Sequence, residues 1–152
     1  MKTLIIVRHG EEEPNGIDLT VDGVKAIIAL VQRIEDIVKN QKIMILSSDK
    51  DRAVETAMVI QRIIRKERPH FAETNILWTE DSKGEKLDDV LKLVLSYEKE
   101  YDVIIIVTHT DYVRDFPPFF AKEQLNKNLH PFNCMKGEGL ILDCNEITLK
   151  KI

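Results

Sequence analysis

Two short, uninterrupted apolar runs constrain the fold of this chain most strongly: Thr3–Val7 and Val103–Val107. Both runs are rich in Ile and Val, and neither alternates between apolar and polar residues. Such a continuous run is typical of a strand that is buried on both faces. A sheet made of these strands needs helices on both sides, so the two runs predict an α/β protein.

Helical patterns alternate with the strand-like runs. Thr20 can cap a helix whose apolar residues recur at steps of three and four from Val21 to Val38. The other expected elements are a strand at Ile43–Leu46, a helix marked by Ala53–Ile64 with a capping box at Ser48 and Asp51, a short strand at Ile76–Trp78, a helix marked by Leu87–Val94, a short helix broken at Pro117-Pro118, and a terminal hairpin of Gly139–Asp143 and Glu146–Lys150. This order predicts one domain over residues 1–152, an α/β fold of three layers. Its sheet is mainly parallel, with helices on both faces and antiparallel edge strands.

Composition narrows the class of protein. The chain has 152 residues, 43% of them hydrophobic, and a formal net charge of −4. It can therefore bury a core, and disorder is excluded. No apolar run approaches the ~18 residues of a membrane span, and the run after Met1 is too short for a secretory signal. Cys134 and Cys144 are expected to be reduced thiols of a cytoplasmic protein, and the negative charge argues against nucleic acid as a partner.

Residues that can take part in catalysis or bind an anion follow three of the expected strands. Arg8-His9-Gly10 follows the first run, Ser47–Arg52 follows the second strand, and Thr108-His109 follows Val103–Val107. Ligands of open α/β sheets bind at the carboxyl ends of the strands. We therefore expect two arginines and two histidines to meet at one edge of the sheet.

This set of side chains suits phosphoryl transfer. Guanidinium groups such as that of Arg52 match charged phosphoryl oxygens with planar donors, and the start of a helix also favours an anion. A neutral imidazole, as on His9, can attack phosphorus, and Gly10 would let the loop approach the phosphate closely. Cationic side chains can supply the electrostatic stabilisation, so no metal or cofactor is expected. The sequence contains neither a Gly-rich dinucleotide fingerprint nor a phosphate loop.

Four segments also resemble a known family, in its order along the chain. They are Arg8-His9-Gly10-Glu11, Leu19-Thr20…Gly23, Ser47-Ser48…Arg52-Ala53-Val54-Glu55-Thr56-Ala57 and Thr108-His109. Together they resemble the histidine phosphatase superfamily, which has the phosphoglycerate mutase-like fold. The chain length is closer to the small phosphohistidine phosphatases of that superfamily than to its mutases.

The resemblance implies a role for each matching residue. It makes His9 the nucleophile that becomes phosphorylated and places Arg8, Arg52 and His109 in the phosphate pocket. Gly10 and Asn15 would also contact the phosphate, Asn15 from the rim. The general acid would be Glu80, with Asp81 and Glu85 as the alternatives. The implied substrate is a phosphorylated small molecule or a phosphoprotein, and the reaction is hydrolysis of a phosphomonoester or of protein phosphohistidine.

Several alternatives stay open at the level of sequence. A regulatory pseudo-phosphatase would bind phosphate without turnover, and a mutase-type phosphotransferase would pass the phosphoryl group on. A metal-dependent hydrolase would use the following side chains: His9, His109, Glu11, Asp49, Asp51 and Asp111. The segment Asp49-Lys50-Asp51 departs from the family pattern and would bring two carboxylates and a lysine near the pocket. Glu11–Glu13 is expected in a solvated loop with Glu11 orienting pocket groups, and Trp78 is expected in the core.

Overall fold

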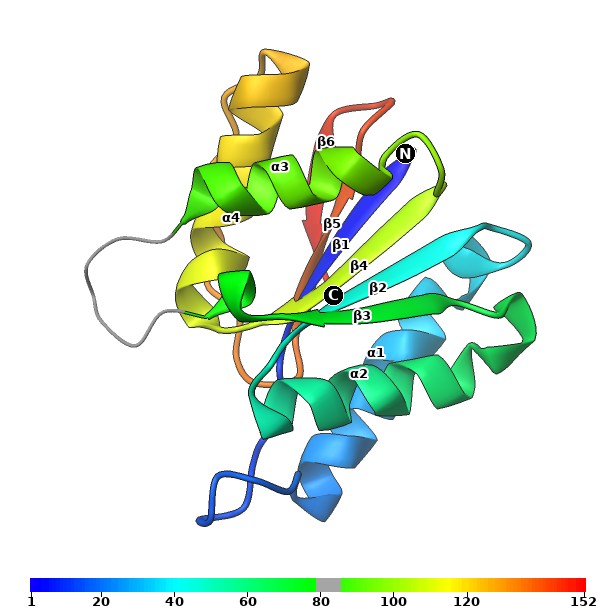
Figure 1. The fold of residues 1–152 in the computed structure, drawn as a ribbon, viewed down its shortest axis with the longest axis vertical. Coiled ribbons are helices and arrows are strands. Elements are labelled where there is room, and N and C mark those ends of the chain that lie inside the picture. The colour runs from blue at the N-terminus through cyan, green and yellow to red at the C-terminus, as the bar shows by residue number, and fades with distance from the viewer. Residues whose placement is uncertain (79–85) are drawn as a thin grey trace.

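A computed structural model describes residues 1–78 and 86–152 of the chain (Figure 1). Its elements along the chain are β1 (Thr3–Arg8), α1 (Val21–Val38), β2 (Ile43–Ser48), α2 (Asp51–Ile63), the 3₁₀ helix η1 (Arg65–Glu67), β3 (His70–Thr74), the 3₁₀ helix η2 (Asn75–Leu77), α3 (Leu87–Tyr97), β4 (Val103–Thr108), α4 (Thr110–Leu125), β5 (Gly139–Asp143) and β6 (Thr148–Lys151).

The six strands form one mixed sheet in the order β3-β2-β4-β1-β5-β6. The pairs of β4 with β1 and β2, and of β2 with β3, are parallel, whereas β5 and β6 are antiparallel at one edge. Arg8 is in register with Thr108, and Ser47 with Val107. The carboxyl ends of β1, β4 and β2 are therefore level. The α/β fold predicted from the sequence is confirmed.

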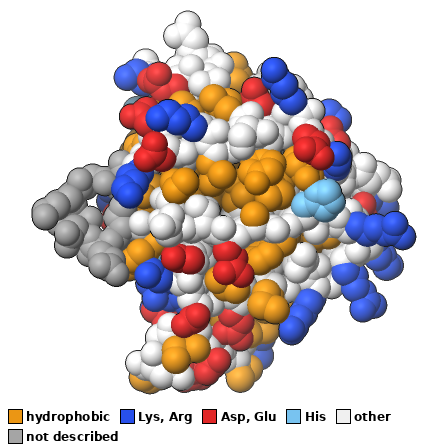
Figure 2. All heavy atoms as spheres, in the orientation of Figure 1, with side chains coloured by type: hydrophobic (Ala, Val, Ile, Leu, Met, Phe, Trp, Pro, Cys, Tyr) orange, Lys and Arg blue, Asp and Glu red, His pale blue; other side chains and the backbone are white. Residues whose placement is uncertain are grey.

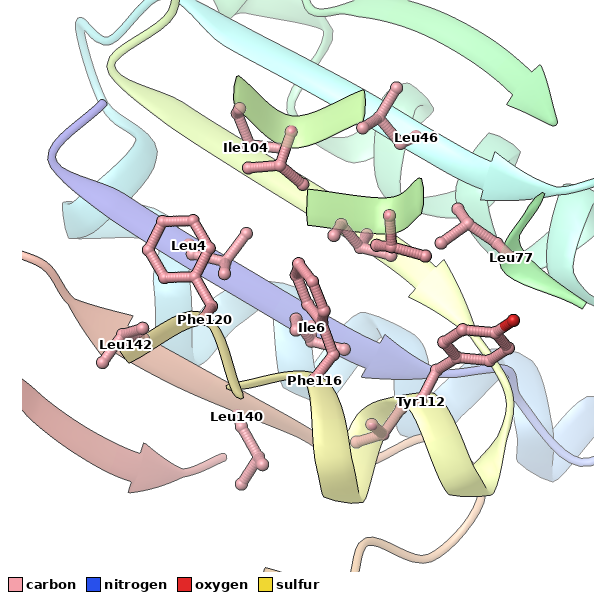
Figure 3. Close-up of a cluster of buried hydrophobic side chains, with 14 of the residues drawn as sticks. Leu4, Ile6, Leu46, Leu77, Ile104, Tyr112, Phe116, Phe120, Leu140 and Leu142 are labelled. Atoms are coloured by element: carbon pink, nitrogen blue, oxygen red, sulfur yellow. The ribbon is translucent and has the colours of Figure 1, made fainter. Parts of the chain in front are cut away.

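Helices cover both faces of the sheet, with α1 and α2 on one side and α3 and α4 on the other (Figure 1). Side chains of a strand alternate between faces, so neighbours along β1 enter different cores. Ile5 and Val7 pack toward α1 and α2, while Leu4 and Ile6 pack toward α3 and α4. Figure 3 shows the second core, in which Phe116 and other side chains of α4 lie against the sheet. Both faces of β1 are thus apolar, which explains its uninterrupted run.

The first helix begins where its capping residue predicts. The Thr20 side chain accepts a hydrogen bond from Gly23 N at 2.9 Å, which satisfies one free donor of the first turn. The buried stripe of α1 runs through Ile27, Val31 and Ile34, whereas Val21 is 70% exposed. The helical period is therefore correct, although its first apolar position faces solvent.

The strand predicted at Ile76–Trp78 is wrong. Strand β3 lies earlier, at His70–Thr74, and Asn75–Leu77 forms a 3₁₀ helix that the Thr74 side chain caps by accepting from Ile76 N at 3.2 Å. As an edge strand, β3 is only partly buried and contains few apolar residues. Its sequence therefore lacks the apolar pattern of the inner strands. Leu77 is fully buried, so the apolar residues around it look like a buried strand although they form a 3₁₀ helix.

The predicted break at Pro117-Pro118 is also wrong, because α4 continues through both prolines to Leu125. A proline within a helix costs about 3 kcal/mol because it cannot donate to the preceding turn. Burial of a phenylalanine side chain stabilises by about 1.5–3 kcal/mol, and both Phe116 and Phe120 are buried on this helix. Tertiary packing of α4 against the sheet thus offsets the local preference.

The surface varies in character from one region to another. On the face in Figure 2, apolar side chains gather between α3 and β3, and charged side chains surround them.

Cys134 and Cys144 are both free thiols. Within residues 1–78 and 86–152, no helix combines the length and the apolar character that a membrane crossing requires.

Candidate active site

Strand pairing brings the two predicted histidines together. His9 N donates to Thr108 O at 3.0 Å, which continues the β1–β4 ladder by one residue. His9 and His109 directly follow these strands, and their ring centroids are 5.1 Å apart. Only 4% of His9 and 8% of His109 is exposed. Two segments separated by a hundred residues of chain thus form one buried imidazole pair.

The Arg52 side chain joins both imidazoles. Arg52 is the second residue of α2, which starts just after β2 ends. Its Nε donates to His9 Nε2 at 3.2 Å, and one terminal nitrogen lies 3.4 Å from His109 Nδ1. The free N–H groups and dipole of a helix N-terminus add positive potential at this position. Arg52, His9 and His109 therefore face one point.

Hydrogen bonds define which His9 nitrogen can react. His9 Nδ1 lies 2.8 Å from Gly10 O, and a carbonyl oxygen can only accept, so Nδ1 carries the hydrogen. Nε2 then holds the lone pair that accepts from Arg52. Burial lowers the pKa of His9 to about 4; the Gly10 carbonyl and Glu12 oppose this change, while Arg52 and Arg8 add to it. At neutral pH, His9 is a neutral imidazole with a nucleophilic Nε2.

His109 has the other tautomer. Its Nδ1 faces a guanidinium donor of Arg52, so its Nε2 carries the hydrogen and lies 3.0 Å from Ser48 Oγ. Burial lowers the pKa of His109 to about 3, and the nearby His9 and Arg52 charges add to this effect.

The capping box expected at Ser48 and Asp51 is wrong. The N-cap residue of α2 is Lys50, which makes no side-chain capping bond, and the Ser48 side chain contacts His109.

Arg8 is anchored beside the pair. One terminal nitrogen of Arg8 donates to Cys134 O at 2.9 Å, and Arg8 N donates to Glu138 O at 2.9 Å. Arg8 Nε is buried and has no hydrogen-bond partner among the residues that the structure describes. A guanidinium held in this way keeps donors available for an anion next to His9.

The loop after β1 is tied to α2. Gly10 N donates to Thr56 Oγ1 at 2.9 Å, and this hydroxyl donates to Arg52 O at 2.7 Å. A Cβ at Gly10 would lie 3.3 Å from Gly23 O and from the Leu19 side chain. A side chain at position 10 would therefore require the start of α1 and the Leu19 side chain to shift by a few tenths of an ångström.

The expectation that Trp78 lies in the core is wrong. The Trp78 ring is half-buried with its centroid 4.3 Å from that of His109, and Arg52 Cζ lies 5.2 Å from the same ring. Lys50 Nζ lies 5.5 Å from it, so the expected proximity of this lysine is confirmed. Asp49 and Asp51, the two carboxylates expected near the pocket, are exposed. No sequence pattern distinguishes a tryptophan beside a histidine from one in a core.

The expectation that Glu11 orients pocket groups is also wrong. Glu11 is exposed, whereas Glu12 Oε2 lies 3.6 Å from His9 Nδ1 and 2.8 Å from Lys136 Nζ. The three consecutive glutamates gave no signal for this choice, because their directions depend on the turn that follows Gly10. Lys136 comes from the loop before β5, and its proximity to residue 12 depends on the folded topology.

The remaining residues predicted for the site make no contact with His9, Arg52 or His109 among the described residues, or they lie outside the described residues. Asn15 is exposed; it donates to Asp18 at 3.3 Å and accepts from Ile17 N at 2.9 Å, both within its own loop. Glu80, Asp81 and Glu85, the candidates for the general acid, lie outside the described residues. Within those residues, no group of three or more His, Cys, Asp or Glu side chains could hold a metal ion.

The end of β1 and the start of α2 lie within a segment that matches a known family, whereas His109 lies outside that segment. The family model described as histidine phosphatase superfamily (branch 1) matches residues 4–78, which include His9 and Arg52. This match identifies residues 4–78 as a histidine phosphatase superfamily segment. No curated protein gives a significant match to the full sequence.

Solved structures of superfamily proteins share this fold. The protein histidine phosphatase SixA in complex with tungstate has a TM-score of 0.71 at 14% identity, covering 99% of this chain and 96% of that one. SixA from Agrobacterium tumefaciens, described as a candidate phosphohistidine phosphatase, has a TM-score of 0.64 at 15% identity, covering 99% and 95%. A phosphoglycerate mutase from Plasmodium falciparum has a TM-score of 0.59 at 25% identity, covering 99% and 88%. The expected phosphoglycerate mutase-like fold is confirmed.

Proposed function

We propose that this chain is a phosphatase that transfers a phosphoryl group to His9 and then to water. One observation carries the proposal: His9 Nε2, which holds a lone pair, lies 3.2 Å from Arg52 Nε, and Arg52 also lies 3.4 Å from His109. Guanidinium donors beside a neutral imidazole suit a phosphoryl group that is attacked by nitrogen.

The proposed reaction has two steps. The phosphoryl oxygens replace the histidines as partners of Arg52, with Arg8 as a further donor and with His109 beside them in the pocket. Nε2 then forms a bond to phosphorus, and the bond from phosphorus to the leaving group breaks, the electron pair departing with the leaving group. In the second step water attacks the phosphorus, and His9 regains its lone pair as phosphate leaves. Stabilisation of the transferred charge by fixed donors is the main catalytic contribution, about 3–4 kcal/mol for each.

The substrate proposed is protein phosphohistidine or a phosphomonoester. The match of residues 4–78 to the superfamily and the fold shared with proteins described as phosphohistidine phosphatases support this class. An alcohol leaving group requires an acid, for which Glu80 is the first candidate and Asp81 and Glu85 the alternatives. The nitrogen leaving group of phosphohistidine requires less protonation by an acid than an alcohol does. The proposed partners are thus phosphoproteins or phosphorylated small molecules.

The test is hydrolysis of p-nitrophenyl phosphate and of a phosphohistidine peptide in the presence of a chelator. We expect turnover by the parent and a loss of at least about 10³-fold in His9→Ala, because the nucleophile is gone. Circular dichroism checks that the variant is folded. Equal activity of folded His9→Ala would overturn the proposal. Vanadate binding without turnover would indicate a phosphate-binding regulatory protein instead, and activity that returns only when metal is added would indicate a metal-dependent hydrolase.

A further inference from the structure

A buried carboxylate oxygen lies beside the ring nitrogen of His9 that does not react. Glu12 Oε2 is 3.6 Å from His9 Nδ1, whose hydrogen is donated to Gly10 O. Lys136 Nζ lies 2.8 Å from the same carboxylate oxygen. Burial raises the pKa of Glu12, but the Lys136 ammonium and the other nearby donors outweigh it and hold that pKa below its usual value. Glu12 is therefore an anion at neutral pH.

The loop that carries Lys136 is fixed to the same strand end. Gly137 N donates to His9 O at 3.0 Å, and Cys134 O accepts from Arg8 at 2.9 Å. Gly137 has φ +78°, and a Cβ there would lie 2.9 Å from Ala26 Cβ, so this backbone requires glycine. The loop thus contacts β1 on both sides of residue 136. Because the hydrogen bond from Gly137 N holds the backbone next to Lys136 against His9, the Lys136 ammonium is held near Glu12 as well.

We infer that Glu12, anchored by Lys136, is a positioning residue that keeps the hydrogen of His9 on Nδ1 and stabilises the positive ring that forms when Nε2 is phosphorylated. The inference rests on the proposed function and extends it to the lifetime of the intermediate.

The charge balance of the proposed reaction explains why such a carboxylate is useful. His9 starts neutral, with a hydrogen on Nδ1 and a lone pair on Nε2. Once the lone pair forms the bond to phosphorus, Nδ1 keeps its hydrogen and the imidazole ring becomes cationic. Arg8 and Arg52, which suit the phosphoryl oxygens, disfavour this cation. Glu12 is the opposite charge near the ring and offsets their effect.

The size of the effect follows from distance and exposure. An opposite charge within about 4–6 Å shifts such an equilibrium by about 10- to 1000-fold. The Glu12 side chain is 20% exposed and is shared with Lys136, so solvent and the lysine weaken its field. We therefore expect about a tenfold effect, at the lower end of that range.

The experiment compares the parent with Glu12→Gln, using radiolabelled phosphoramidate as the donor and rapid quenching. The variant should form phosphoenzyme about tenfold more slowly, and its phosphoenzyme should hydrolyse faster, because the cationic ring has lost its counter-charge. The matched control is Glu13→Gln, which removes the same charge from an exposed neighbour and should behave like the parent. Lys136→Met should shift the acid limb of phosphoenzyme formation to higher pH, and Lys136→Arg should restore it.

The outcomes separate this inference from the proposed function. If the parent forms phosphohistidine and Glu12→Gln matches its rate of formation and its lifetime, the positioning role is overturned and the proposed function stands. Slower formation with an unchanged lifetime would overturn the stabilisation of the cationic ring. If the parent takes up no label while it binds vanadate, the proposed function itself fails.

Discussion

At the residue scale, the environment of two imidazoles determines the chemistry. His9 and His109 are buried beside two guanidinium groups, which disfavour a further positive charge. One contact fixes the hydrogen on each ring: Gly10 O can only accept, which places the His9 hydrogen on Nδ1, and Arg52 can only donate to His109 Nδ1, which places the His109 hydrogen on Nε2. The result is an unprotonated Nε2 on His9 and a donor on His109 at neutral pH. The same side chains in solvent would be partly protonated near their usual pKa.

We expect NMR titration of the ring protons to show directly that His9 and His109 are neutral at neutral pH. The pKa is about 4 for His9 and about 3 for His109, so neither ring should titrate between pH 8 and pH 5.5. Comparison with His9→Gln and His109→Gln assigns the resonances. A titration midpoint near 6.5 for either ring would contradict the burial that the structure gives them.

At the element scale, α2 transmits the position of Arg52 to the loop after β1 through one hydroxyl. Thr56 is fully buried; it accepts from Gly10 N at 2.9 Å and donates to Arg52 O at 2.7 Å. Thr56→Val would keep the shape and leave the Gly10 N–H unsatisfied, so the free energy of unfolding should fall by about 1–3 kcal/mol. Urea denaturation measures this. Thr56→Ser retains the hydroxyl and should recover most of the loss; an equal loss in both variants would mean that the hydrogen bond contributes little.

The start of α1 makes a second contact of this kind with the loop. A Cβ at Gly23 would lie 2.4 Å from Glu11 O and 2.9 Å from Glu11 N, both of which are backbone atoms that cannot rotate away. Alanine gains up to about 1 kcal/mol of helix propensity, but overpacking costs about 1–3 kcal/mol. We expect Gly23→Ala to lower the free energy of unfolding and to reduce phosphatase activity by displacing the loop. Lys25→Ala, on the exposed side of the same turn, should change neither; a stabilised Gly23→Ala would contradict the packing.

At the scale of the whole molecule, the site depends on a sheet that aligns three strand ends. The parallel register of β1, β4 and β2 brings His9, His109 and Ser48 together from distant parts of the chain. The fold therefore stabilises two buried neutral imidazoles that the unfolded chain would protonate. The free energy of unfolding and the protonation of His9 and His109 are therefore coupled, because the folded and unfolded chains bind different numbers of protons.

This coupling predicts how stability changes with pH. Both folded pKa values lie below the ordinary 6.5, so between pH 6.5 and pH 5 the unfolded chain binds protons that the folded chain does not. The free energy of unfolding should therefore fall as the pH falls through this window, by about 1.5 kcal/mol for each histidine. Denaturation at several pH values measures it, and a double variant with glutamine at both positions should lose most of the dependence. A stability that rises toward pH 5 would contradict the neutral pair.

The sequence was most informative where local pattern and buried position coincide. The inner strands and the capped helix α1 are readable because their apolar periods follow directly from burial, and the residues after the strands follow from topology. Strand β3 was missed since an edge strand needs few apolar residues, and α4 passes through its prolines because tertiary packing overrides local preference. Ser48, Trp78 and the Glu12–Lys136 pair depend on three-dimensional proximity, for which the sequence contains no spacing rule.

The most direct measurement is to trap the intermediate on the native chain. The protein is mixed with phosphoramidate, quenched within milliseconds under alkaline conditions that preserve phosphohistidine, digested, and examined by mass spectrometry. We expect an acid-labile phosphoryl adduct on the peptide that contains His9, absent from His9→Ala and present in Glu13→Gln. An adduct on another residue, or turnover by the parent with no adduct on any peptide, would contradict nucleophilic attack by His9.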